Sequence, residues 1–381
     1  MKAPTNPFSY GGLALDDAFA NREAELEDLK ADARNGQDVV IFAPRRYGKS
    51  SLVWKAIQQL APDDVLAAWV NLMATPTKEK LAEKLAASIY ESVASPLARA
   101  KERALRPFRG LRVNPQVTVS PDDGSYSFSF GVGHSAGDIE ATLERLLELP
   151  AELSAGRDQR VVLVLDEFQE IETIDPGLPR LMRTIFERQP EVARVYLGGK
   201  RHMMERIFND ENEPFWRSAK RVELDVIDPS RFRAFITERF ESTRKEIGKE
   251  VVERLLQRTM GHPYATQELC YFLWEQTPFD AVAKGGQLDD ALAAVQRSEN
   301  AHFELRWEDA ASAQRLVLQA LAREPGRPLT SSYRLRHELP SSATTQSALR
   351  ALTERELVAR ASDGSHHISE PFFAEWIVAL E

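Results

Sequence analysis

A short loop between an apolar run and a helical segment carries the strongest chemical signal in this sequence. Gly48, Lys49 and Ser50 complete the phosphate-binding pattern G-x-x-x-x-G-K-[S/T], in which Ala43 stands at the position of the first glycine. Gly48 permits a turn whose N–H groups face phosphate oxygens, Lys49 brings a cation to the β- and γ-phosphates, and the Ser50 hydroxyl suits Mg²⁺. The sequence therefore predicts a nucleotide-binding loop made of Ala43, Pro44, Arg45, Arg46, Tyr47, Gly48, Lys49, Ser50 and Ser51.

The alternative is an arginine-rich turn that contains Gly-Lys-Ser by chance. The flanking residues favour phosphate binding, because residues 39–43 read as a buried strand and residues 49–60 as a helix. The positive N-terminal end of that helix then faces the bound phosphates. Alanine at position 43 matters little if its φ is negative and more if the turn needs a positive φ.

An apolar run over residues 161–165 ends in Asp166 and Glu167, which form the second signal. In a parallel α/β sheet, ligands bind beyond the carboxyl ends of the strands. Asp166 is placed to accept a Mg²⁺-bound water, so Ser50 and Asp166 are the candidate metal residues. Glu167 is placed to polarise the attacking water, so Glu167 and Lys49 are the candidate catalytic residues. A solvated turn after a core strand is the alternative interpretation.

Five short segments that read as strands are separated by segments with helical periodicity, at residues 39–43, 65–70, 161–165, 195–197 and 222–226. This alternation predicts an α/β fold with a parallel sheet and helices on both faces. Residues 106–131 interrupt it with polar–apolar alternation on both sides of Pro-Asp-Asp-Gly at 121–124, which indicates a β-hairpin insertion. We therefore predict an α/β core over residues 1–227.

The strand pattern stops near residue 228, and residues 228–303 show only helical periodicity. Residues 304–381 then read as three helices followed by a strand–turn–strand, which is the layout of a winged helix. The sequence thus predicts three domains: the core, a small helical domain and a winged helix.

The composition excludes several classes of protein. Forty-nine Lys and Arg against 58 Asp and Glu give a net charge of −9, so we do not expect DNA to be bound through the whole surface. A hydrophobic fraction of 43% excludes wholesale disorder. The single cysteine, Cys270, excludes an intramolecular disulfide and fits a reducing compartment. The sequence shows no targeting segment and no apolar run near the ~20 residues of a membrane span, so we expect a cytoplasmic protein without membrane contact.

Together these motifs resemble the archaeal-type P-loop ATPase family, part of the AAA+/STAND group of NTPases that also occurs in bacteria. The resemblance covers nearly the whole chain and rests on residues 6–8, 19–23, 44–52, 166–170, 200–204, 261–264 and 370–376. It implies an AAA+/ASCE-type core with a helical lid and a C-terminal winged helix. It also implies ATP and Mg²⁺ as cofactors and hydrolysis of ATP to ADP and phosphate. The preference for ATP over GTP rests on the resemblance alone.

The resemblance adds candidate residues outside the two motifs. Arg22 lies in the segment that wraps the adenine in that group, where it contacts nucleotide or else forms a salt bridge on a helix. His262 and Pro263 match the G-x-P motif of the lid, where they approach the nucleotide or simply break a helix. Arg45 and Arg46 serve the phosphates or a neighbouring subunit, and an oligomer is compatible with the sequence.

The resemblance departs from the family at the end of the fourth strand. The family often has Gly-Ser there, whereas this sequence has Gly198-Gly199, so a polar sensor is absent at position 199. Lys200 or Arg201 is a candidate to reach the γ-phosphate instead. Solvated surface cations are the alternative.

The winged helix leaves a second class of function open. Residues 323–360 contain seven arginines and four glutamates, a local charge of +3, and polar residues begin the expected recognition helix at 341–346. One hypothesis is a Mg²⁺-dependent ATPase whose nucleotide state rearranges its domains. The other is a nucleotide-gated module with little turnover that binds DNA, or a protein partner, through the winged helix.

Overall fold

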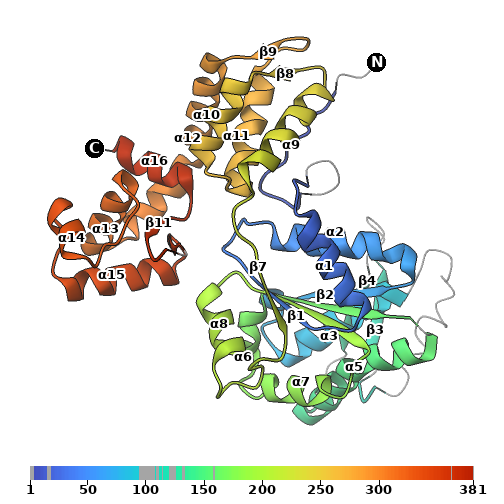
Figure 1. Cartoon of the computed structure of the whole chain (residues 1–381). Helices are drawn as coiled ribbons and strands as arrows, with labels where there is room; N and C mark the ends of the chain where they lie inside the picture. Colours follow the sequence, from blue (N-terminus) through green and yellow to red (C-terminus); the bar gives the residue numbers. More distant parts are fainter. Residues whose placement is uncertain are drawn as a thin grey trace. The chain divides into compact units, whose positions relative to one another are not determined.

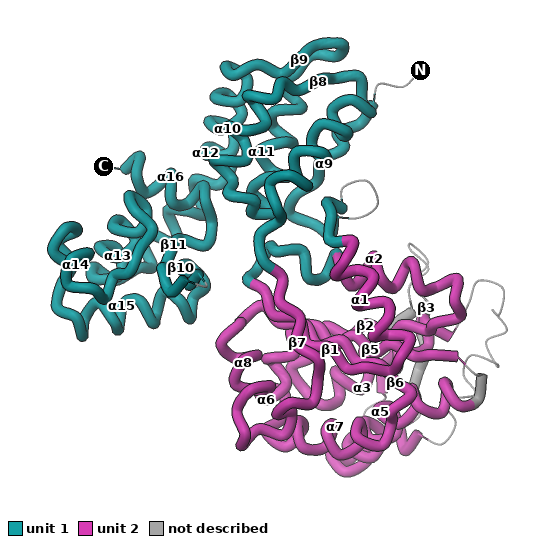
Figure 2. The backbone as a smooth tube through the Cα atoms, viewed as in Figure 1, with its two compact units in different colours: residues 1–22, 44–51, 225–381 teal, residues 23–43, 52–224 magenta. Residues whose placement is uncertain are grey.

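The computed structural model describes residues 4–14, 19–93, 108, 111–113, 115–119, 126–130, 134–157, 159–361 and 363–380. The chain divides into two compact units (Figure 2). Unit 1 contains Met1–Arg22, Pro44–Ser51 and Asp225–Glu381, and unit 2 contains Glu23–Ala43 and Leu52–Leu224. The phosphate-binding loop therefore groups with the C-terminal half of the chain, whereas the sheet forms the other unit.

Unit 2 is built on a five-stranded sheet in the order β2-β5-β6-β1-β7 (Figure 1). Each neighbouring pair of strands is parallel. The strands are β1 (Val39–Phe42), β2 (Leu66–Asn71), β5 (Val161–Asp166), β6 (Val192–Leu197) and β7 (Lys220–Glu223). β1 is buried at every residue and appears in the sequence as an unbroken apolar run. β6 is also buried throughout, although it includes the charged residue Arg194. The expected parallel sheet is confirmed.

Helices cover both faces of this sheet. Val40, Leu163 and Leu165 belong to a cluster with apolar residues of α3 (Lys78–Val93), α5 (Ala136–Arg157) and α7 (Leu178–Phe186). The alternate strand residues Val39 and Ile41 are also buried but do not belong to this cluster. α1 and α2 lie on the other side of the sheet in Figure 1. The remaining helices and turns are α1 (Glu23–Arg34), α2 (Lys49–Leu60), α6 (Ile171–Ile174), α8 (Arg201–Asn209), and the 3₁₀ turns Ala61–Asp63, Leu72–Ala74 and Phe168–Glu170.

The expected hairpin is present as β3 (Pro115–Val119) and β4 (Tyr126–Phe130), which pair antiparallel as a separate two-stranded sheet. Phe128 and Phe130 alternate with exposed Ser129 and are buried in the same cluster as α3 and α5. The turn predicted at 121–124 lies outside the described residues.

Unit 1 contains the helical segment that follows the sheet. Its helices are α9 (Pro229–Glu241), α10 (Lys249–Thr259), α11 (Pro263–Gln276) and α12 (Gly285–Glu308), with the short parallel strands β8 (Glu246–Ile247) and β9 (Val282–Ala283). The N-terminal segment packs on it, since the Phe8 ring lies 5.5 Å from Phe240 and Asn6 donates to the Tyr271 carbonyl. α12 runs past residue 303, so the boundary we placed at 303–304 falls within a helix.

The C-terminal residues form the winged helix. It consists of α13 (Ser312–Arg323), α14 (Ser331–Arg336), α15 (Ser342–Glu354), the antiparallel strands β10 (Val358–Arg360) and β11 (His366–Ile368), and α16 (Pro371–Ala379). One continuous apolar cluster extends from Phe8 through the lid helices to Ile377 of α16. The lid and the winged helix therefore share a core within unit 1.

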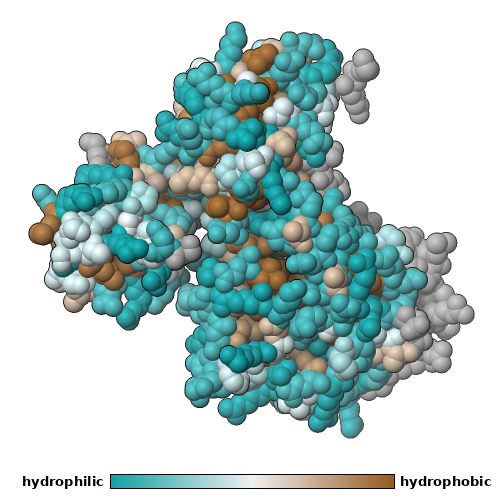
Figure 3. All heavy atoms as spheres, in the orientation of Figure 1, coloured by the Kyte–Doolittle hydropathy of each residue, from teal (hydrophilic) through white to brown (hydrophobic). Residues whose placement is uncertain are grey.

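Hydrophilic residues cover most of the visible face of each unit (Figure 3). No helix in the described part of the chain combines the length and the apolar character that crossing a membrane requires.

Gly36, which follows α1, offers a test of this packing. It has a φ of +71°, and a Cβ atom at this position would lie 2.2 Å from the Pro190 carbonyl oxygen. We expect Gly36→Ala to lower the free energy of unfolding by about 2 kcal/mol or more, as measured by urea denaturation. Gly286→Ala is the matched control, because position 286 has open space around it and should change by less than ~1 kcal/mol. Equal stability of the two variants would contradict the close approach.

Candidate functional site

The phosphate-binding loop connects β1 to α2 through Pro44–Gly48. Gly48 has a φ of +84°, and nothing would lie within 4 Å of a Cβ atom at this position, so the backbone conformation alone selects glycine here. Arg46 is also left-handed, with a φ of 67°, whereas Ala43 is not among the described residues with positive φ. Alanine is therefore compatible with the first position of the pattern.

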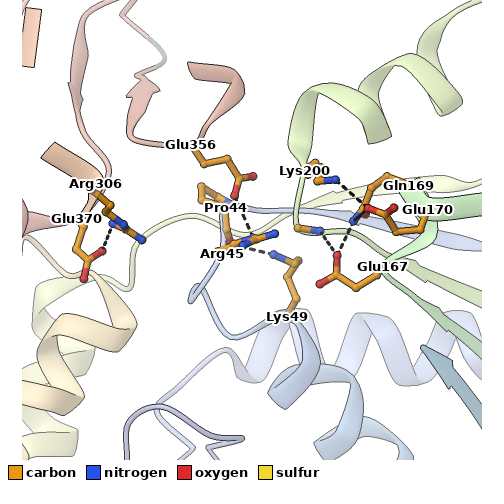
Figure 4. Close-up of polar contacts among 11 residues, drawn as sticks. Pro44, Arg45, Lys49, Glu167, Gln169, Glu170, Lys200, Arg306, Glu356 and Glu370 are labelled. Carbon is orange, nitrogen blue, oxygen red and sulfur yellow. Dashed lines mark hydrogen bonds and ion pairs between the residues drawn. The ribbon is translucent and has the colours of Figure 1, made fainter. Parts of the chain in front are cut away.

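The helix α2 begins at Lys49, so its first N–H groups lie directly after the loop. The Lys49 ammonium donates to the Pro44 carbonyl at 2.9 Å, across the base of the loop (Figure 4). The two serines that follow differ in their contacts. The Ser51 hydroxyl accepts the Ala14 N–H at 3.0 Å and is buried, while Ser50 is half-buried. Ser51 thus ties the loop to the N-terminal segment, and Ser50 remains the candidate metal residue.

Arg22 binds main-chain carbonyls of two other segments. Its guanidinium donates to the Asp225 oxygen at 2.6 Å and to the Tyr47 oxygen at 3.3 Å, and the side chain is buried. The structure thus gives Arg22 a third role, beside the two expected ones, in which it holds the loop against the segment that follows the sheet.

His262 and Pro263 begin α11. The His262 Nδ1 accepts the Ala265 N–H at 3.2 Å and caps the helix, and its ring lies 4.9 Å from Tyr47. Burial, with a smaller effect of Arg46, lowers the pKa of His262 to about 3, so the imidazole is neutral. The structure shows His262 as a helix cap that packs on the loop, while Pro263 lines a cavity.

That cavity lies within unit 1 and has a volume of about 220 Å³. The N-terminal segment, the loop and the lid contribute aromatic, small and backbone surfaces to it, which suit a planar ring. Its lining residues are Ser9, Tyr10, Gly11, Gly12, Ala14, Phe19, Ala20, Arg22, Arg46, Tyr47, Gly48, Ser51, Ile227, Phe232, Pro263, Tyr264 and Gln267.

The acidic strand end lies in unit 2, at the carboxyl end of β5. Glu167 is left-handed, with a φ of 53°, and its N–H bonds to the Asp166 carboxylate at 3.0 Å. The Glu167 carboxylate accepts the Gln169 amide at 2.5 Å and the Gly199 N–H at 3.4 Å (Figure 4). These donors fix the direction in which the carboxylate points.

Gly198 makes this arrangement sterically possible. A Cβ atom at position 198 would lie 2.4 Å from Met204 and 2.6 Å from the Gln169 amide oxygen. Gln169 is fully buried. The Gly198-Gly199 pair, read from the sequence as a lost sensor, thus lets the strand end approach Gln169 and places an N–H beside Glu167.

The two sensor candidates are paired with carboxylates of the same unit. Lys200 binds Glu170 at 2.9 Å (Figure 4), and Arg201 binds Glu205 at 2.9 Å and lies 3.6 Å from Glu223. Half-exposed ion pairs of this kind contribute little stability and can be exchanged for another anion.

A comparison with models of protein families identifies the family of this chain. Residues 19–269 match the model of an ATPase domain predominantly from Archaea, and residues 301–379 match that of a probable winged helix domain. The chain belongs to this ATPase family. A search of curated proteins finds no match.

Solved structures show the same fold at low sequence identity. The Walker-type ATPase PABY2304 of Pyrococcus abyssi is 16% identical, with a TM-score of 0.65 over 96% of this chain and 97% of that one. The Aeropyrum pernix ORC2 protein in ADPNP–ADP complexes is 13% identical, with a TM-score of 0.57 over 98% of this chain and 97% of that one. These likenesses concern the fold of this archaeal-type ATPase.

The loop arginines of this ATPase reach the lid and the winged helix. Arg45 lies 3.6 Å from Glu356 (Figure 4). Arg46 binds Glu370 at 2.9 Å and stacks 4.1 Å over the Tyr264 ring. Neither contact was among the two roles expected from the sequence.

Several residues of the site were not singled out from the sequence. Gln169 lies two residues after the Asp-Glu motif, but we assigned it no role from the sequence. Tyr264 and Gln267 lie three residues apart in the lid helix, so they face the same side of it. This spacing could have indicated that both side chains face the site. Glu370 had no such signal, because its partner Arg46 is 324 residues away.

A buried carboxyl group lies near the Arg46–Glu370 ion pair. Glu268 of α11 is fully buried and neither oxygen accepts a hydrogen bond from the described residues. Burial, followed by the charges of Glu299 and Glu370, raises its pKa to about 9, although Arg46 opposes the shift. Glu268 is therefore protonated at neutral pH.

This pKa predicts a pH-dependent stability. Its ordinary value is 4.5, so between about pH 4.5 and 9 the folded chain holds a proton that the unfolded chain releases. The stabilisation is full below pH 4.5 and is lost as the pH rises toward 9. We expect the melting temperature of Glu268→Gln to fall less than that of the wild type between pH 5 and 9. Exposed Glu241→Gln should keep the wild-type slope, and an unchanged slope in Glu268→Gln would refute the protonated state.

Proposed function

We propose that this chain binds ATP with Mg²⁺, hydrolyses it to ADP and phosphate, and couples its nucleotide state to movement of the lid and winged helix. The observation that carries this proposal is the cavity of unit 1, because the phosphate-binding loop lines it together with the N-terminal segment and the lid. A base held there has its phosphates at the loop. Base pocket and phosphate site are then one continuous site for a nucleotide.

The loop supplies the groups that hold the phosphates. The backbone N–H groups around Gly48 and at the start of α2 face the anion, and Lys49 exchanges the Pro44 carbonyl for a phosphate oxygen. The ring of Tyr264 and the small residues at positions 11 and 12 suit the base. The choice of ATP over GTP rests on the family, and competition between the two nucleotides tests it.

The residues present fit a magnesium ion. Mg²⁺ at a nucleotide usually keeps several waters and is held largely by phosphates, so it needs only one or two oxygen ligands from the protein. Ser50 and Asp166 supply the hydroxyl and carboxylate oxygens that Mg²⁺ prefers. The ion, when bound, neutralises charge on the phosphates.

Glu167 is the proposed general base. In-line attack requires an oriented water, and a carboxylate directly after the strand that carries Asp166 can accept its proton. The Gln169 amide and the Gly199 N–H hold that carboxylate. Lys200 and Arg201 are proposed to reach the γ-phosphate by exchanging their carboxylate partners for it.

Turnover of the Glu167→Gln variant tests this mechanism. We expect steady-state phosphate release to fall at least ~100-fold while the dissociation constant of ATP changes less than ~3-fold, because the glutamine cannot accept the proton. Lys49→Ala should instead weaken ATP binding at least ~10-fold. Glu187→Gln, which removes only the exposed pair with Arg183, is the matched control. Wild-type turnover in Glu167→Gln would refute the role of Glu167.

The exposed face of α15 supports the second candidate, a nucleotide-gated binding module. Ser342, Thr344, Gln346, Ser347 and Arg350 are exposed along this helix, while Thr345, Ala348 and Leu349 face the core. A polar helix face of this kind suits contacts to phosphates and base edges. Two arginines near this face are already paired, since Arg336 binds Glu324 and Arg355 lies 3.6 Å from Asp309.

The DNA version of this candidate is tested by fluorescence anisotropy with duplex DNA between 50 and 200 mM salt, about the range over which phosphate contacts weaken strongly. If the winged helix binds DNA, Arg350→Ala should weaken the binding of DNA. It should also lower the slope of the logarithm of the binding constant against the logarithm of the salt concentration by about 1. Absence of binding at every salt concentration would leave a protein partner for the winged helix. Negligible turnover with tight nucleotide binding would favour the module over the ATPase.

A further inference from the structure

The shorter of two ion pairs between the phosphate-binding loop and the winged helix is formed by Arg46. The Arg46 guanidinium binds the Glu370 carboxylate at 2.9 Å and lies 3.9 Å from Glu299 of α12. The same guanidinium stacks on Tyr264, whose hydroxyl donates to Glu299 at 3.3 Å. Arg46 is thus held on one side by an aromatic ring and on the other by carboxylates.

Arg46 also belongs to the cavity that the nucleotide is proposed to occupy. Arg46, Tyr47, Gly48 and Tyr264 all line it. The left-handed φ of Arg46 shapes the turn that precedes Gly48. Because non-glycine residues adopt this conformation only infrequently, outside contacts help to keep the loop in it. The contacts of the Arg46 side chain therefore bear on the conformation of the loop.

Glu370 is placed to provide that contact. It precedes Pro371 at the start of α16, but its side chain makes no cap to the helix. Instead, one carboxylate oxygen accepts a hydrogen bond from Arg46. The other accepts a hydrogen bond from Arg306 of α12 at 2.6 Å (Figure 4). Glu370 is 6% exposed, and removing the charge of a buried carboxylate leaves the charge of its partner uncompensated.

We infer that Glu370 is a positioning residue of the nucleotide site, which acts through Arg46 to keep the phosphate-binding loop in its binding conformation. This inference rests on the proposed function. It makes nucleotide affinity depend on the winged helix, through a contact that any movement of α16 away from the loop would break.

A double-mutant cycle with ADP tests the inference. We expect Glu370→Gln in the full chain to weaken ADP binding about 5- to 20-fold by isothermal titration calorimetry. In an Arg46→Gln background the same Glu370→Gln change should alter the affinity less than twofold, because its route to the loop is already removed. A purely structural role of Glu370, through Arg306 or the start of α16, would weaken binding equally in both backgrounds and would overturn the inference.

Glu375→Gln is the matched control. Glu375 lies on the same helix and binds Arg258 of the lid at 3.1 Å, but it does not reach the loop. It should leave ADP affinity within twofold of the wild type. Thermal unfolding of each variant checks folding, and Glu370→Asp, which keeps the charge but shortens the side chain, should give an intermediate loss if Glu370→Gln is unstable.

The outcomes separate this inference from the proposed function. A wild-type chain that binds no ADP would overturn both. ADP binding that is tight in the wild type and unchanged or tighter in Glu370→Gln would overturn only the inference, with tighter binding showing that Glu370 competes with phosphates for Arg46.

Discussion

The guanidinium of Arg22 donates hydrogen bonds to the Tyr47 and Asp225 carbonyls, and the arrangement of unit 1 depends on these contacts. They join the N-terminal segment, the phosphate-binding loop and the segment that follows the sheet. A buried guanidinium needs acceptors for its donors, and two main-chain carbonyls supply them at a fixed spacing. With these segments held, Tyr47 packs on His262, and a cavity remains between the loop, the N-terminal segment and α11.

The loop is therefore positioned by side chains from outside the sheet as well as by the strand that leads into it. Ser51 binds the N-terminal segment, Arg22 binds Tyr47, and Arg46 binds Glu370 of the winged helix. Each of these contacts links the proposed phosphate site to a part of unit 1 that shares one apolar core. A nucleotide that reshapes the loop would act directly on those contacts, which is the physical basis of the coupling that we propose.

Local patterns predicted the elements that carry the two motifs. The strands before Ala43 and Asp166 are buried on both faces, so their apolar runs are unmistakable, and α2 spans the expected residues 49–60. Other elements lacked such a pattern. We expected a strand at 222–226, but pairing occupies Lys220–Glu223. Three of these four residues are exposed, so no apolar run marks where the strand begins and ends. α16 was missed as a helix, since Phe372, Phe373, Trp376 and Ile377 are all buried and leave little polar alternation. Contacts such as Arg46–Glu370 arise only from tertiary structure, and the roles assigned to the site residues stay predictions.

The central claim is that the cavity of unit 1 holds the base of a nucleotide whose phosphates lie on the loop. A crystal structure of the full chain with ADP and Mg²⁺ tests it most directly. The account predicts the base between the N-terminal segment and Tyr264, with the diphosphate at the N–H groups around Gly48 and within hydrogen-bonding distance of Lys49. A nucleotide bound elsewhere, with this cavity empty or filled by side chains, would contradict it.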